Sequence, residues 1–255
     1  MDQTSPMPVR DDKADSQDAG ASAGNANRLP PNKPNPAELD RDILRKQRII
    51  AGFDPCQYVD TYKVLRTRVL QKMRERGWNT LAVTSPDANA GKTVAAINLA
   101  ISLASEVNQT VLLVDANLRN PNVHQCLGLS PKLGLADHLL DQIEIGKMLL
   151  QPKGIGQLSI LPGNRPTINS AELLSSPQMA RLVEHLKQQD TSRILVFDLP
   201  HLRTPDTLAF APLVDAVLLV IEAGVTTDES LRSAVEHLQG VPIIGTLLNK
   251  SEPVA

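Results

Sequence analysis

Residues 81–100 read LAVTSPDANAGKTVAAINLA, and this stretch decides the fold. The aliphatic run from Leu81 to Thr84 is typical of a buried strand, and the apolar run that begins at Val94 is typical of a helix. Between them lies a loop of small residues that ends in Gly-Lys-Thr. A strand, a small-residue loop, Gly-Lys-Thr and a helix, in this order, are the context of a phosphate-binding loop.

The residues of this loop have the chemistry that a nucleotide phosphate needs. Gly91 lets the backbone approach a phosphate closely, and the loop amides and the helix N-terminus bind anionic oxygens. Lys92 places a point charge against the β- and γ-phosphates, and the Thr93 hydroxyl ligates Mg²⁺. The sequence therefore predicts ATP and Mg²⁺ as ligands. The predicted ATP-binding residues of the loop are Ala88, Asn89, Ala90, Gly91, Lys92, Thr93 and Val94.

The loop departs from the generic pattern, because Pro86 stands where that pattern has glycine. The alternative interpretation is a Gly-Lys-Thr tripeptide that arose by chance. The strand and helix on either side favour the phosphate loop.

Two aspartates end aliphatic segments further along the chain. Asp115 follows the apolar run 110–114, and Asp198 follows the run 194–197. If these strands flank the first strand, both carboxylates point at the Mg²⁺ of the nucleotide, a hard cation that prefers oxygen ligands. We therefore expect Thr93, Asp115 and Asp198 to be the metal ligands. The alternative is that each aspartate only caps the next element.

The rest of the chain alternates between strand and helix patterns, which predicts an α/β fold: a doubly wound, mostly parallel sheet with helices on both faces. Ligands bind beyond the carboxyl ends of the strands in such folds. The predicted strands are 80–84, 110–114, 158–161, 194–197, 216–221 and 243–248, and the predicted helices are about 55–76, 92–106, about 135–150, 177–189 and 227–238.

The sequence predicts four segments of different character. Residues 1–38 contain many Pro, Asp, Asn and Ser residues and no aromatic residue, which is typical of a disordered tail. Residues 39–78 are predicted to form N-terminal helices with a possible role in oligomerisation. Residues 79–250 are predicted to form the phosphate-loop domain, and residues 251–255 a short tail.

Composition excludes several classes of function. The 255 residues carry a formal net charge of −2, and aromatic residues are 2%, so neither a basic field nor a stacking platform for nucleic acid is expected. The two cysteines are too few for a disulfide framework. No segment has the pattern of a signal peptide or a membrane span, so we expect a soluble, cytoplasmic protein.

These motifs resemble those of bacterial tyrosine kinases of the polysaccharide-export type, which belong to the deviant-Walker class with the MinD- and ParA-like ATPases. The resemblance covers about residues 40–250 and includes the last strand, which ends at Asn249. It implies that Lys92 and Asp115 are catalytic, that Asp198 is the Walker B acid, and that Asn249 contacts adenine. It also implies a partner, a membrane polysaccharide co-polymerase that determines chain length, and a peripheral location at the inner membrane through that partner.

The resemblance also implies assembly into a homo-oligomeric ring. Asp60, Lys63 and Arg66 keep the spacing and charge signs of a family helix that docks on the neighbouring subunit. Because residues three apart lie along one helix face, an ordinary solvated face is the alternative interpretation.

The chain departs from this family at several positions. The usual Pro-Gly-Glu before Gly-Lys is replaced by Ala88, Asn89 and Ala90, and the second aspartate of the A′ motif is Asn117, which cannot act as a general base. His201 replaces a second proline, and we expect it to be a solvated loop histidine without a role. The last residues, Lys250 to Ala255, contain no tyrosine cluster, so we expect no autophosphorylation on a tail.

Three functions remain open after these departures. The first is a Mg-ATP-dependent enzyme that hydrolyses ATP or transfers its γ-phosphate to a protein. The second is a catalytically impaired regulator or scaffold on the same fold. The third is a positioning ATPase like MinD and ParA. Asp87 argues against this function, because it stands where that class has its signature lysine.

Overall fold

The structure, a computed structural model, describes residue 1, residues 35–51 and residues 57–251. Its centre is an eight-stranded sheet in the order β1-β4-β5-β3-β6-β2-β7-β8. All neighbouring strands are parallel except β4 and β5, which are antiparallel. The strands are β1 (Asn35–Ala37), β2 (Thr80–Thr84), β3 (Thr110–Asp115), β4 (Leu150–Pro152), β5 (Gln157–Leu161), β6 (Ile194–Asp198), β7 (Ala216–Glu222) and β8 (Ile243–Asn249).

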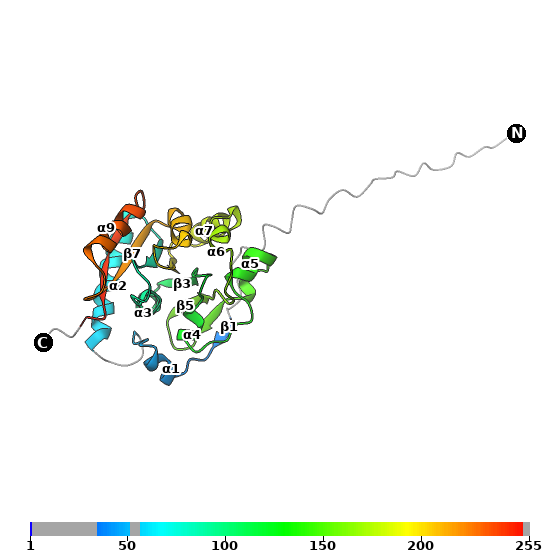
Figure 1. Cartoon of the computed structure of the whole chain (residues 1–255). Helices are drawn as coiled ribbons and strands as arrows, with labels where there is room; N and C mark the ends of the chain where they lie inside the picture. Colours follow the sequence, from blue (N-terminus) through cyan, green and yellow to red (C-terminus); the bar gives the residue numbers. More distant parts are fainter. Residues whose placement is uncertain (2–34, 52–56, 252–255) are drawn as a thin grey trace.

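Helices cover both faces of this sheet, which confirms the predicted α/β fold (Figure 1). One apolar cluster packs the first four helices, α1 through α4, against one face of the sheet. A second cluster packs the remaining helices, α5 through α9, against the other face. The helices are α1 (Arg41–Lys46), α2 (Gln57–Arg76), α3 (Lys92–Ala104), α4 (Val123–Cys126), α5 (Leu135–Asp141), α6 (Ser170–Leu174), α7 (Pro177–Gln189), α8 (Pro205–Phe210) and α9 (Asp228–His237). Two 3-10 turns, Ile145–Lys147 and Ala211–Leu213, complete the described elements.

The central strands are buried on both faces, as their mostly apolar side chains predict. Every residue of β2 and every residue of β6 is buried. Strand β2 lies between β6 and β7, and β3 lies on the other side of β6. Of the two strands that end in an aspartate, β6 flanks the loop strand β2 as expected, but β3 does not, because β6 lies between them. The carboxyl ends of β2, β6 and β3 are still neighbours along one edge of the sheet, where ligands bind in such folds.

The predicted helix over residues 135–150 is wrong in its second half. Helix α5 ends at Asp141, and Gln142 takes a left-handed conformation with φ 54°. The chain then makes a 3-10 turn and enters β4. The apolar run was ambiguous, because a buried strand and a buried helix have similar composition over a short segment.

The predicted tail boundary at residue 38 also differs from the structure. Residues 35–37 form β1, which lies beside β4 through bonds from Asn35 N to Leu149 O (3.0 Å) and from Lys153 N to Ala37 O (2.9 Å). Residues 2–34 and 252–255, where the remaining tail predictions fall, lie outside the described residues, as do residues 52–56.

The first helices pack into the same core as the phosphate-loop helix. Val69, Leu70 and Met73 of α2 are buried, and Tyr62 packs against this cluster. The side chain of Asn98 in α3 accepts hydrogen bonds from the backbone N–H groups of Ile50 (2.8 Å) and Ala51 (2.9 Å). Residues 48–51 are therefore attached directly to α3.

None of the helices in the described part of the chain combines the length and the apolar character that a membrane crossing requires.

Candidate nucleotide-binding site

The predicted phosphate loop connects β2 to α3 and contains two left-handed residues, Asn89 (φ 64°) and Gly91 (φ 89°). Among side-chain residues, asparagine is one of the most tolerant of this conformation, so Asn89 preserves the turn despite the loss of a glycine. Ala88 and Asn89 are exposed, Gly91, Lys92 and Val94 are half-buried, and Ala90 and Thr93 are buried.

The last strand supports the loop from the side. The Asn249 side-chain amide, at the end of β8, donates a 2.8 Å hydrogen bond to the Ala90 carbonyl. A Cβ atom on Gly91 would lie 2.2 Å from Nδ2 of Asn249, so this contact also requires glycine at position 91. The structure thus brings Asn249 to the loop; the predicted contact with adenine stays a prediction.

Helix α3 begins in a way that suits an anion. No side chain caps its N-terminus, and its first turn contains no acidic residue. Its first residue is Lys92, although a cation at the positive end of a helix dipole is unfavourable by itself. A bound phosphate offsets this cost, because both the lysine and the free amides then face negative charge.

The two predicted acids meet at the ends of adjacent strands. Asp115 of β3 and Asp198 of β6 are paired in register, and both side chains are fully buried. The Thr93 hydroxyl donates a 2.7 Å hydrogen bond to Oδ2 of Asp198. The three predicted metal ligands therefore lie at the same edge of the sheet as the loop.

The two carboxylates differ in what already binds them. Asp115 Oδ2 accepts bonds from the amides of Asn122 (2.9 Å) and Val123 (3.0 Å), and its Oδ1 accepts one from Asn117 (3.3 Å). Asp115 thus shapes the loop that follows β3. Oδ1 of Asp198, by contrast, is buried and has no hydrogen-bond partner in the described part of the chain.

The electrostatics favour a cation at this place. Burial and repulsion from Asp198 raise the pKa of Asp115 to about 8. Burial also raises the pKa of Asp198 to about 6, against the opposing effects of Lys92 and Thr93. A divalent cation would offset this cost of two buried charges, and the free Oδ1 of Asp198 is an available ligand. The residues therefore fit Mg²⁺.

The described side chains do not by themselves form a complete set of metal ligands. Within residues 35–51 and 57–251, no group of three or more His, Cys, Asp or Glu side chains is arranged to hold a metal ion. This agrees with a site in which phosphate oxygens and water supply most of the ligands, as is usual for Mg²⁺.

Two arginines that are not among the predicted site residues lie around this site. Arg203 pairs through Nε with Asp87 of the loop (2.8 Å) and bonds Ser230 of α9 (3.1 Å). Arg119 pairs with the fully buried Asp206 of α8 (2.9 Å). Their roles were not visible in the sequence, because both pairs join segments that are far apart along the chain.

His201 differs from the expected solvated histidine. It follows β6 closely and is half-buried, and its Nδ1 is buried without a hydrogen-bond partner among the described residues. Lys92, Asp87, Arg203 and Arg119 all interact electrostatically with its ring.

A groove of about 720 Å³ lies beside the loop, between α8 and α9. Pro86, Arg203, Leu208 and His237 are among its lining residues, but Lys92 and Thr93 are not. The groove is therefore distinct from the predicted phosphate-binding residues Lys92 and Thr93.

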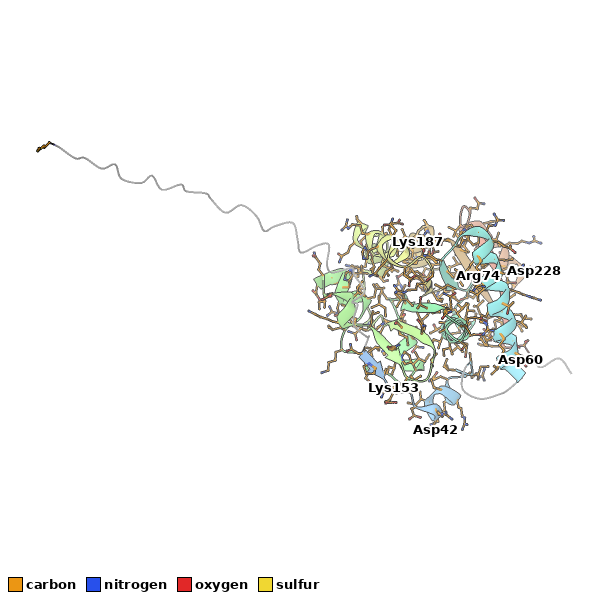
Figure 2. All side chains as sticks on the ribbon, turned by 180° about the vertical axis from the view of Figure 1, so that it is seen from behind. Asp42, Asp60, Arg74, Lys153, Lys187 and Asp228 are labelled. Atoms are coloured by element: carbon orange, nitrogen blue, oxygen red, sulfur yellow. The ribbon has the colours of Figure 1, made fainter. Side chains whose placement is uncertain are left out.

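The three predicted interface residues of α2 do not share one exposed face. Asp60 and Lys63 pair with each other (2.8 Å), with side chains 78% and 55% exposed. Figure 2 shows α2 along one side of the molecule, with Asp60 near its start and Arg74 near its end. Arg66 instead bonds Glu106 (2.7 Å) and the Ser102 carbonyl (3.2 Å) at α3.

This fold and site define a P-loop NTPase fold with one acid at the end of β6, beside the loop strand β2, and the other at the end of β3, the next strand along. No established family profile matches the chain. The succinoglycan biosynthesis transport protein ExoP of Rhizobium meliloti (strain 1021) is 30% identical over 219 residues, which are 82% of this chain and 27% of that protein. The tyrosine-protein kinase YwqD of Bacillus subtilis (strain 168) is 30% identical over 215 residues, which are 82% of this chain and 89% of that protein.

A solved structure of a kinase domain is also similar to this chain. The VpsO kinase domain matches with a TM-score of 0.67 and 29% identity, over 75% of this chain and 95% of that domain. The chain belongs to the bacterial tyrosine-protein kinase family. It spans about a quarter of the length of ExoP.

Proposed function

We propose that the chain binds ATP with Mg²⁺ at the loop that ends in Gly91-Lys92-Thr93, and that it acts in exopolysaccharide or capsule biosynthesis by regulating a membrane co-polymerase. The observation that carries the ATP site is the contact of Thr93 with Asp198, whose second carboxylate oxygen is buried and unpaired. The name of the relative ExoP supports the setting in polysaccharide biosynthesis.

Each site residue has a role in this proposal. Lys92 and the amides of residues 88–94 stabilise negative charge on the phosphates. Thr93 and Asp198 would hold Mg²⁺, which would supply positive charge to the phosphate oxygens. Asp115 orders the loop after β3 and orients the nucleophile. Asn249 lies next to the loop and contacts adenine.

The test is calorimetry of the full chain with ATP or ADP, with and without Mg²⁺. We expect binding that depends on Mg²⁺ and is lost in Lys92→Ala. Lys147→Ala is the matched control. Lys147 is exposed in the 3-10 turn after α5, so its replacement removes the same charge at a place away from the loop. No binding at millimolar ATP contradicts the proposal.

A second candidate, a catalytically impaired regulator, is favoured by Asn117. This amide stands where the family has a second aspartate, and it cannot accept a proton. The two candidates differ in their requirement for turnover. Polymer export that persists in a strain carrying Lys92→Ala favours the regulator, and export that fails favours the enzyme.

The proposed partner is a membrane co-polymerase, and the proposed location is the cytoplasmic face of the membrane through that partner. Fractionation of cells with and without the co-polymerase tests both statements. We expect the chain in the membrane fraction only when the co-polymerase is present. A membrane fraction that is unchanged without it contradicts this partner.

A further inference from the structure

Strand β8 forms one end of the described sheet, where it pairs with β7 alone. The Ala223 amide donates to the Asn249 carbonyl (3.0 Å), so the backbone groups of Asn249 face β7. Because these groups alternate in direction along a strand, the N–H and C=O groups of Thr246 and Leu248 face away from the sheet. The Ile244 carbonyl also faces outwards, since it accepts a 2.8 Å bond from a lysine of α2.

The outer edge of β8 is accessible at its centre. Thr246 is exposed, and the Leu248 side chain is 54% exposed. Within the described ranges, no backbone hydrogen bond joins the outward groups of these two residues to another segment. The seven residues of β8 carry no charge. An uncharged strand with a free edge is a template for one more strand.

A basic stripe of α2, formed by Arg68, Lys72 and Arg76, lies beside this edge. The three residues are exposed and recur at every fourth position, so they share one side of the helix. Lys72 is the residue that bonds β8. None of the three forms an ion pair with another described residue, and the nearby Glu75 accepts a bond from Gln71 instead (2.9 Å). The stripe therefore presents positive charge next to the free edge.

We propose that the outer edge of β8 binds an extended acidic segment of a partner protein as a further strand of the sheet. The outward groups of Thr246 and Leu248 bond the backbone of that segment, and its carboxylates on the α2 side pair with the basic stripe. In this mode of recognition, backbone bonds give affinity and alternate side chains give specificity. The surface is separate from the proposed ATP site.

The charge of the stripe favours this partner over two other occupants. A two-fold pairing of β8 with the β8 of a second copy would bring two basic stripes to the same side of the joined sheet. The segment of this chain before Asn35 joins the sheet at β1, which is the opposite edge. That segment is also rich in Pro, Asp, Asn and Ser, most of which are depleted in strands.

The experiment uses the full chain without nucleotide and a short fluorescein-labelled peptide in which glutamate and valine alternate. Fluorescence anisotropy measures binding, and amide hydrogen exchange locates it. We expect exchange at the Thr246 and Leu248 amides to slow by at least about tenfold when the peptide is bound. A peptide with lysine in place of each glutamate is the charge control and should bind more weakly.

Two variants test the two parts of the surface. Arg68→Glu should weaken binding by about threefold or more, because it turns an attraction into a repulsion. Arg74→Glu is its matched control, since Arg74 is exposed on α2 but lies outside the stripe (Figure 2). Thr246→Pro removes an outward N–H and leaves the bonds to β7 in place, so it should weaken binding by about tenfold. Urea unfolding checks that each variant remains folded, and Arg68→Glu keeps the test decisive if Thr246→Pro does not.

The opposite results overturn the inference without touching the proposed ATP site. Absence of binding at millimolar peptide overturns it. Binding that leaves exchange at Thr246 and Leu248 unchanged shows adhesion to α2 alone and also overturns it. Equal effects of Arg68→Glu and Arg74→Glu overturn the role of the stripe. A dimer that dissociates in Thr246→Pro, seen by sedimentation equilibrium, assigns the edge to a second copy and overturns the acidic partner.

Discussion

The Thr93 hydroxyl and Oδ2 of Asp198 lie 2.7 Å apart, and this hydrogen bond joins the first turn of α3 to the end of β6. Both residues are buried, so the bond is shielded from water. The same two side chains are proposed magnesium ligands. The bond therefore holds Asp198 in place beside the phosphate loop before any ligand arrives.

Replacement of Thr93 tests this relationship. Thr93→Val keeps the shape but removes the hydroxyl, which leaves the buried Asp198 carboxylate without its donor. We expect the free energy of unfolding to fall by about 1–3 kcal/mol, the range for a buried polar group that loses its partner. Urea unfolding measures this change, and calorimetry should show that Mg²⁺-dependent ATP binding is lost.

Thr93→Ser is the matched control, because it keeps the hydroxyl and loses only a methyl group. We expect it to retain ATP binding and most of the stability. If Val and Ser variants behave alike in both measurements, the hydroxyl has no role here.

Gly91 gives a prediction about the loop itself. Gly91→Ala places a side chain in a left-handed conformation (φ 89°) and moves its Cβ to 2.2 Å from Nδ2 of Asn249. We expect the free energy of unfolding to fall by about 1–3 kcal/mol, the usual range for backbone strain of this kind. We also expect the affinity for ATP to fall. Thermal unfolding and calorimetry measure the two effects.

Asn89 provides the comparison, because it has φ 64° and is exposed. Asn89→Gly relieves rather than creates strain, so it should leave stability and ATP affinity nearly unchanged. Equal losses of affinity in Gly91→Ala and Asn89→Gly would contradict the close contact with Asn249.

Asp215 gives a prediction about pH, away from the nucleotide site. Its carboxylate accepts bonds from the Asn79 and Thr80 amides (both 3.0 Å), the Thr80 hydroxyl (2.8 Å) and the Lys187 ammonium (2.8 Å). Burial raises its pKa, but these bonds outweigh burial and hold the pKa below the ordinary 3.8. The charged form is therefore stabilised by folding.

The sign of the effect follows from this lowered pKa. The contribution of Asp215 is fully present well above pH 3.8 and is lost as the pH falls through its folded pKa. At neutral pH we expect Asp215→Asn to lower the unfolding free energy by about 1–3 kcal/mol. The difference from the unchanged protein should shrink as the pH falls below 3.8. Glu236→Gln, at an exposed position of α9, is the control in urea unfolding at each pH. A difference that is constant with pH contradicts the charged role.

The sequence was sufficient for the central part of the fold and the site, because the relevant signals are local. The glycine-containing loop, the strand before it and the aspartates at 115 and 198 are each visible within a few residues. The structure confirms the predicted doubly wound sheet. It places both acids at the predicted edge, while their roles as ligands stay predictions.

What the sequence could not predict depends on contacts between distant segments. Strand β1 is Asn-Pro-Ala, which has little strand propensity, and it forms because β4 offers an open edge. The pair of Asp87 with Arg203 spans more than a hundred residues of chain, and no local pattern marks it. The burial of Nδ1 in His201 is not marked by any local sequence pattern either.

The charges of α2 give the last prediction, on self-association. We expect Asp60→Lys/Lys63→Glu to weaken any oligomer, because both side chains are exposed and available to a neighbouring subunit. The unfolding free energy of this double variant should hardly change, since an exposed ion pair contributes only about 0–1 kcal/mol.

Arg66→Ala should instead lower the stability of the single chain, because Arg66 is 17% exposed and bonds Glu106 and Ser102 of its own chain. Sedimentation equilibrium and urea unfolding separate the two effects. An oligomer that is lost in Arg66→Ala while stability is kept would show that Arg66 leaves α3 to bind a neighbour, as the family pattern implies.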